Sequence, residues 1–214
     1  MRTDITTIDS SGSGIQLALN RIEGLADVEQ LSKKDRLHLR LLAEETFGMV
    51  TAIVGDFSAK FWAEGENRNF RIILQADADV DEAEKAQLLS VSSTGMNIAG
   101  RGVMEKIWNL YRMFIGSGGQ APAMKEIRGM TSGKDEVSYG ELGVVRVEDG
   151  KGGENYAWSL KQYRTNVKNA MDKDTVLQGA WDELEKSIVA NIASDIQVGV
   201  SDDQVKMVIY LIAA

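Results

Sequence analysis

The chain has 214 residues, a formal net charge of −8, one histidine and no cysteine. The lack of cysteine excludes disulfides, thiolate chemistry and cysteine-ligated metal sites, and the negative charge argues against sequence-independent nucleic-acid binding. The longest apolar run, residues 207–214, is too short to span a bilayer. We therefore expect a soluble, cytoplasmic protein of one large domain, without a signal peptide and with neither nucleic acid nor membrane as a partner.

The N-terminal third is predicted to be mostly helical. Residues 1–13 are polar and rich in Ser and Gly, so we predict a flexible arm, followed by a single domain over 14–214. Apolar residues recur every three to four positions over 15–31, which predicts one or two amphipathic helices interrupted near Gly24. Ser32 and Asp35 then mark the start of a helix over 33–54. Its expected buried stripe comprises Leu37, Leu41, Ala43, Phe47, Val50 and Val54.

Strand patterns occur in two pairs. Residues 57–63 and 70–76 flank the turn-rich segment 64–69, and residues 196–200 and 205–212 flank 201–204, so both pairs are predicted to be β-hairpins. Between them, residues 156–171 and 181–192 are predicted to be helices. Residues 116–155 contain too few apolar side chains for a core, and we interpret them as an irregular, lid-like insertion with a short strand near 144–147.

Two segments carry possible ligand chemistry. Gly95, Gly100 and Gly102 precede an apolar helical face over 103–114. A glycine-rich loop that opens a helix can bind phosphate through backbone N–H groups, although the same glycines also suit a plain surface loop. The acidic segment 77–81 either coordinates a cation through its alternating carboxylates or forms a solvated turn at a strand end.

The order of these segments resembles the GHKL-type ATPase fold, which is shared by histidine-kinase catalytic domains, anti-sigma-factor kinases and gyrase. LRLLAEETFGMV (39–50) is similar to the helix that carries a catalytic Glu and a Mg²⁺-binding Asn. FRIILQADADV (70–80) is similar to the strand that leads into the Asp-x-Gly-x-Gly turn, and GMNIAGRGVMEKI (95–107) is similar to the second glycine box. The closing segment, 181–212, also resembles the C-terminus of small bacterial ATP-binding proteins.

The resemblance implies an α+β fold, a two-layer sandwich whose mixed, largely antiparallel sheet carries helices on one face. It also implies a nucleotide site with ATP or ADP as the ligand. Glu45 would be the catalytic base, and the residues implied to hold the nucleotide are Asp77 (to adenine) or Asp79, Gly95, Asn97, Gly100, Arg101 and Gly102.

This sequence departs from the family pattern at two points. Met49 occupies the position of the Mg²⁺-binding Asn, four residues after Glu45, and a thioether is a poor ligand for a hard cation. Asp79 and Asp81 replace the glycines that follow Asp77. We therefore expect no protein metal ligand, and Mg²⁺ dependence and catalysis of the ATPase or serine/histidine-kinase type are left open. Glu44 and Glu45 also fit a solvated helix face.

Two functions follow from this reading. The first is a bacterial, histidine-kinase-like, ATP-binding regulatory protein that holds nucleotide between the Glu45 helix, Asp77 and the Gly95–Gly102 loop. The alternative is a degenerate, non-catalytic interaction or assembly module that no longer binds nucleotide. Both include a protein partner or self-association.

Overall fold

The computed structural model describes residues 1–54, 56–77, 144–148, 154–170, 178, 181–182, 184–185, 187–201 and 204–214. Seven strands form one sheet in the order β1-β2-β3-β7-β6-β5-β4, and each pair of neighbours is antiparallel. The strands are β1 (Thr6–Asp9), β2 (Ser58–Glu66), β3 (Asn69–Asp77), β4 (Val144–Glu148), β5 (Glu154–Ser159), β6 (Asp195–Ser201) and β7 (Gln204–Ile212). The helices are α1 (Ile15–Val28), α2 (Lys33–Val54), α6 (Leu160–Ala170) and α8 (Ile188–Ile192).

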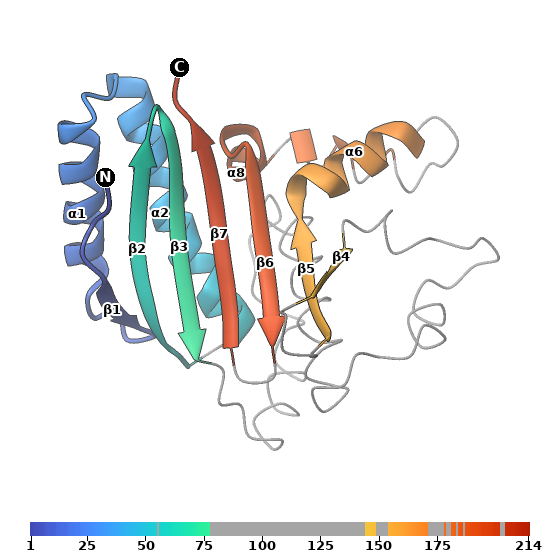
Figure 1. Cartoon of the computed structure of the whole chain (residues 1–214), viewed down its shortest axis with the longest axis horizontal. Coiled ribbons are helices and arrows are strands. Elements are labelled where there is room, and N and C mark those ends of the chain that lie inside the picture. Colours follow the sequence, from blue (N-terminus) through green and yellow to red (C-terminus); the bar gives the residue numbers. More distant parts are fainter. Residues whose placement is uncertain are drawn as a thin grey trace.

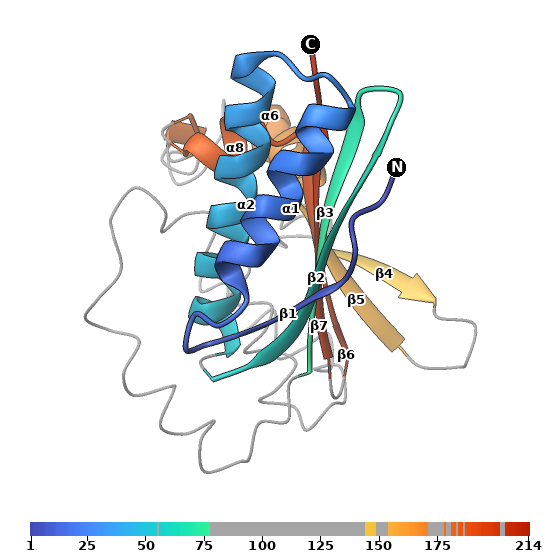
Figure 2. The ribbon, with the colours of Figure 1, turned by 90° about the vertical axis from the view of Figure 1, so that its left-hand side faces the viewer.

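The described helices α1, α2 and α8 lie on one side of the sheet (Figures 1 and 2). The side chains that point toward them alternate along β2, β3 and β7 with side chains on the other face, as a pleated strand requires. Phe61 and Phe70 are each 1% exposed on the helix-covered face, and the Phe47 ring of α2 lies 4.9 Å from the Phe61 ring. The predicted α+β class, with helices on one face of an antiparallel sheet, is confirmed at this level.

The predicted bounds of α2 are confirmed, because Ser32 caps its first turn. The Ser32 hydroxyl accepts a hydrogen bond from the Asp35 backbone N–H (3.1 Å) and donates one to the Asp35 carboxylate (2.7 Å). Asp35 is 4% exposed and also accepts a long bond from the Ala214 backbone N–H. The Ser32 hydrogen bond, assisted by Ala214, lowers the pKa of the Asp35 carboxyl although burial opposes the shift.

The predicted buried stripe of α2 is only partly right. Ala43, Phe47 and Val50 are buried as expected, but Leu37 is 55% exposed. The buried face is centred instead on Leu39, Leu42, Ala43, Thr46, Phe47, Met49 and Val50. Helical spacing alone allows several stripes, and the contacts of α2 with β3 and β7 select this one.

Both predicted hairpins are confirmed. β2 and β3 are joined by the two-residue turn Asn67–Arg68, in which both residues have positive φ (49° and 64°), as a tight hairpin turn requires. β6 and β7 pair from Asp195↔Tyr210 to Ser201↔Gln204. β7 also pairs with β3, so the two hairpins lie side by side in the centre of the sheet.

The prediction of a flexible arm over residues 1–13 is wrong. β1 pairs with β2, and Ile8 is 1% exposed beneath the helices. Arg21 of α1 donates to the Ile5 carbonyl (2.9 Å) and the Thr6 hydroxyl (2.7 Å), which ties this edge segment to the helix layer. A polar composition did not reveal these long-range contacts.

Three other boundaries differ from prediction. α1 is continuous through Gly24, which is exposed at a position where a Cβ would meet no atom. The predicted helix over 156–171 begins only at Leu160, because residues 154–159 form β5. Residues 144–148 and 154–155, predicted within an insertion, are strands of the main sheet, whereas the rest of 116–155 lies outside the described residues.

A single helix over 181–192 is also wrong. Ser187 has an extended backbone (φ −79°, ψ 116°), and its hydroxyl accepts a hydrogen bond from the Ala190 N–H at 3.2 Å. This is the geometry of an N-cap, so α8 starts afresh at Ile188. Apolar periodicity continues across Ser187 and therefore does not reveal the break.

Candidate functional site

Two of the predicted site elements lie within the described residues, the Glu45 helix and the end of β3, and both reach the same end of the sheet. Strand register places Asp9, Ser58, Asp77 and Gln204 in one row across β1, β2, β3 and β7. α2 ends at Val54, four residues before Ser58, so its C-terminal end lies close to this row. Figures 1 and 2 show the C-terminal ends of α2 and β3 at the same end of the molecule. We call this region the Asp77 end.

Glu45 lies on the exposed side of α2, nine residues before the helix ends. A helix rises about 1.5 Å per residue, so Glu45 is roughly 14 Å from the end of α2 along the axis. Its carboxylate makes no hydrogen bond or ion pair with another described residue. Its neighbour Glu44 accepts a bond from Arg40 Nε at 2.9 Å. The exposure agrees with a solvated helix face and leaves the Glu45 carboxylate accessible to a ligand.

Met49 has the opposite environment. It is 4% exposed and belongs to the core beneath α2. One turn earlier, the Thr46 hydroxyl is also buried and donates to the Leu42 carbonyl (2.6 Å). The position that carries a Mg²⁺ ligand in the GHKL resemblance therefore holds a packed apolar side chain in this chain.

Asp77 is the last residue of β3 and is exposed. The other predicted nucleotide-binding residues lie outside the described residues: Asp79, Gly95, Asn97, Gly100, Arg101 and Gly102. The described structure thus brings the end of the Glu45 helix and the end of β3 to one end of the sheet, but the alternation along β3 places Asp77 on the same face as Gln75 and Ile73, opposite α2. The glycine loop stays a prediction.

A second acidic element, which the sequence patterns did not predict, lies at the Asp77 end. The Asp9 carboxylate accepts hydrogen bonds from Ser11 N–H (2.9 Å), Ser11 Oγ (2.5 Å) and Ser13 N–H (3.2 Å). These bonds, led by the Ser11 hydroxyl, lower the pKa of Asp9. Ser10 Oγ donates to the Asp56 carboxylate at 3.0 Å and links this loop to the segment after α2. The DSSGSG pattern is the signal that could have indicated this turn.

These carboxylates determine what the Asp77 end can do chemically. A carboxylate such as that of Asp77 can accept a hydrogen bond from an amino group such as that of adenine, whereas Asp9 and Asp56 already accept bonds within the loop, and all three carboxylates repel phosphate. Among the described residues, no three His, Cys, Asp or Glu side chains are placed to hold a metal ion. A phosphate-binding part of the site would therefore have to come from other residues.

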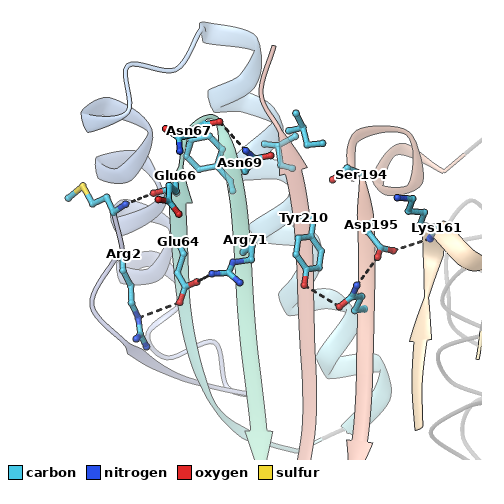
Figure 3. Close-up of a pocket in the computed structure, with 16 residues that line it drawn as sticks. Arg2, Glu64, Glu66, Asn67, Asn69, Arg71, Lys161, Ser194, Asp195 and Tyr210 are labelled. Atoms are coloured by element: carbon cyan, nitrogen blue, oxygen red, sulfur yellow. Dashed lines mark hydrogen bonds and ion pairs between the residues drawn. The ribbon is translucent and has the colours of Figure 1, made fainter. Parts of the chain in front are cut away.

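A hollow of about 920 Å³ opens at the opposite end of the sheet, near the β2–β3 turn (Figure 3). Its polar residues are bonded largely to one another. Arg71 pairs with Glu64 (2.5 Å), and the Tyr210 hydroxyl donates to Gln197 Oε1 (3.1 Å). Asp195 accepts bonds from the Lys161 N–H, the Ser159 hydroxyl and the Gln197 amide, which fixes the start of α6. The hollow contains none of the predicted site residues.

No family model, curated protein or solved structure matched the chain in the three comparisons made. The GHKL resemblance therefore depends on the order of the sequence motifs alone. Within the described part of the chain, no helix is both long enough and apolar enough to cross a membrane.

Proposed function

We propose that this chain is a histidine-kinase-like, ATP-binding regulatory protein of GHKL type that binds nucleotide at the Asp77 end without needing Mg²⁺ and does not carry out metal-dependent phosphoryl transfer. The observation that carries the proposal is the convergence of the Glu45 helix and the end of β3 at one end of the sheet (Figure 1). The hairpin–helix order of the GHKL resemblance predicts this convergence.

Asp77 would accept the hydrogen bond of the adenine amino group. It is the terminal residue of a central strand that is paired on both sides, with β2 and with β7, so its backbone is held firmly. A carboxylate on a rigid strand end orients a base better than one on a loop would. The Gly95–Gly102 loop, with Asn97 and Arg101, would supply the phosphate contacts that the acidic Asp77 end lacks.

The buried Met49 supports binding without metal-dependent phosphoryl transfer. Such transfer uses a cation held by oxygen ligands against the phosphates. The Met49 thioether offers no oxygen and is packed in the core. Glu45 alone could position a water, but the charge-neutralising cation would have no ligand at the position used by the family. The same observation favours the alternative, an interaction module on this fold that no longer binds nucleotide.

A nucleotide titration of paired variants tests the proposal. Asp77→Ala removes the acceptor for the adenine amino group, and we expect it to weaken ATP binding by about tenfold or more. Asp56→Ala removes one exposed carboxylate from the same end and controls for the change in charge, which by itself should not weaken binding of an anion. Wild-type protein should also prefer ATP over GTP, since GTP carries an oxo group where ATP carries the amino group.

Equal affinities of the Asp77→Ala and Asp56→Ala variants for ATP would contradict the adenine contact. A complete lack of nucleotide binding by the wild-type chain would leave the alternative function. In that case the Gly95–Gly102 segment would be a surface loop, and protein partners would be the ligands to seek.

A further inference from the structure

The sheet has a second face that carries no described helix. In Figure 1 this face is toward the viewer, with α1 and α2 behind the strands, and Figure 2 shows it edge-on. Two adjacent rows of side chains cross its centre: Lys60, Gln75 and Lys206 form one, and Trp62, Ile73 and Val208 form the other. We call these six residues the open-face patch.

The lysine row is cationic within an acidic protein. The chain has 32 acidic and 24 basic residues besides its histidine. Lys60 and Lys206 are both exposed, and neither forms an ion pair with another described residue. The strands that carry Lys60 and Lys206 lie on either side of β3, so the two backbone positions are two strand spacings, or about 9.5 Å, apart. The patch thus presents two exposed lysines whose backbone positions are held two strands apart.

In the neighbouring row, Trp62 and Val208 provide the apolar contact area. Ile73 is 5% exposed, although it points to the face without described helices, and it is flanked in register by Trp62 and Val208, which are half-buried. The Arg2 guanidinium lies 5.0 Å from the centre of the Trp62 ring system. The next row along the strands runs from Glu64 through Arg71 and Tyr210 to Asp195. It is charged and internally bonded, so the apolar row is bounded on that side.

We infer that the open-face patch binds an acidic amphipathic helix of a partner protein. A helix is about 10 Å across with its side chains, so one that runs along β3 would fit between Lys60 and Lys206. Carboxylates on both flanks of its apolar stripe would meet the two ammonium groups, and its apolar residues would pack on Trp62 and Val208. Such a helix would give this face the same kind of cover that α2 gives the other.

Single-stranded nucleic acid fits the patch less well. Base stacking needs open aromatic faces, and the one aromatic ring in the patch, Trp62, already has Arg2 over it. The net charge of −8 also repels a polyanion at long range, whereas a short helix with carboxylates only along its flanks avoids most of that repulsion.

The test uses a synthetic peptide of about 18 residues, with leucines at helical spacing on one face and glutamates on both flanks, long enough to form helix on binding. Fluorescence anisotropy of the labelled peptide should show saturable binding that weakens as salt is raised. The Lys60→Glu/Lys206→Glu double variant should bind it about tenfold more weakly or worse. Lys33→Glu/Lys34→Glu makes the same charge change at two exposed lysines of α2 and should shift affinity by no more than about twofold.

Lys60→Gln/Lys206→Gln is the milder variant if charge reversal prevents folding, and it should also lose affinity. A peptide with lysines in place of the flanking glutamates should not bind. Equal weakening by the two lysine-pair reversals, absence of acidic-peptide binding at millimolar concentration, or preferential binding of an oligonucleotide would each overturn the inference.

Discussion

Two glycines in the turn between β1 and α1 give a sharp test of how the N-terminal strand is held. Gly12 and Gly14 both have positive φ, +89° and +78°, a conformation in which a residue with a side chain is strained. Their surroundings differ. A Cβ at Gly12 would meet no atom within 4 Å, whereas a Cβ at Gly14 would lie 2.1 Å from the Thr7 carbonyl oxygen. Alanine at Gly14 therefore adds a collision to the same backbone strain.

The expected free-energy losses follow from these distances. The strain of positive φ costs an L-residue roughly 1–2 kcal/mol, so Gly12→Ala should lower the unfolding free energy by about that amount. At Gly14 the contact is about 1.3 Å short of the 3.4 Å at which ordinary packing begins. Thr7 cannot easily retreat, since β1 is paired with β2 and Ile8 is in the core. Relief of such overpacking costs roughly 1–3 kcal/mol more, which gives about 2–5 kcal/mol for Gly14→Ala.

Urea unfolding of both variants, followed by circular dichroism, measures the two losses under identical conditions. We expect Gly14→Ala to be the less stable variant by about 1–3 kcal/mol, with an unchanged dependence of the unfolding free energy on urea. Equal losses in the two variants would refute the reasoning. They would mean that β1 does not press on the start of α1, and that residues 1–13 do behave as a loose arm.

Three further predictions concern α2. Phe61→Ala should lower the unfolding free energy by about 3–5 kcal/mol. A double-mutant cycle with Phe47→Ala should give a coupling energy of about 0.5–1.5 kcal/mol, because the two rings are in contact. The absence of coupling would contradict the packing of α2 on β2. Met49→Asn should lower the unfolding free energy by about 2–4 kcal/mol, because the amide would be buried. For the same reason it should not make nucleotide binding dependent on Mg²⁺. A stable variant whose nucleotide binding becomes Mg²⁺-dependent would show that this position is open to a cation. Asp35 has a pKa below its ordinary 3.8, so the ionised carboxylate stabilises the fold above about pH 4, and that contribution is lost as the pH falls from 3.8 through the lower folded pKa. Asp35→Asn should therefore flatten the acid side of the stability–pH curve, and an unchanged acid side would contradict the role assigned to the Ser32 bond.

Local sequence signals predicted the elements whose contacts are local. α2 begins after Ser32 because the cap and the helix are adjacent in the chain, and the β2–β3 hairpin is specified by its own turn. β1 depends on pairing with residues some fifty positions away, and its four residues contain a single apolar anchor, Ile8. No local pattern reports such pairing. Ser187 shows that a local pattern can also mislead. Its N-cap ends one helical segment and starts another, while the apolar residues on both sides keep their helical spacing.

The candidate site could be predicted only in outline. The order of motifs placed Glu45 and Asp77 in one site, and the described elements bring the helix and the strand end to one region. The sequence did not reveal that Met49 is buried, because which stripe of α2 faces the sheet is decided by β3 and β7. It also did not reveal the Asp9 loop, whose link to Asp56 depends on the return of the chain after α2.

The central claim is that the Asp77 end binds nucleotide without needing Mg²⁺. Calorimetric titration of ATP and ADP into the wild-type chain, with and without Mg²⁺, tests it most directly. We expect saturable binding of both nucleotides with affinities that Mg²⁺ changes by less than about threefold, a difference of roughly 0.6 kcal/mol. Binding that appears only with Mg²⁺ would contradict the role assigned to the buried Met49, and no heat of binding at millimolar nucleotide would contradict the proposed function itself.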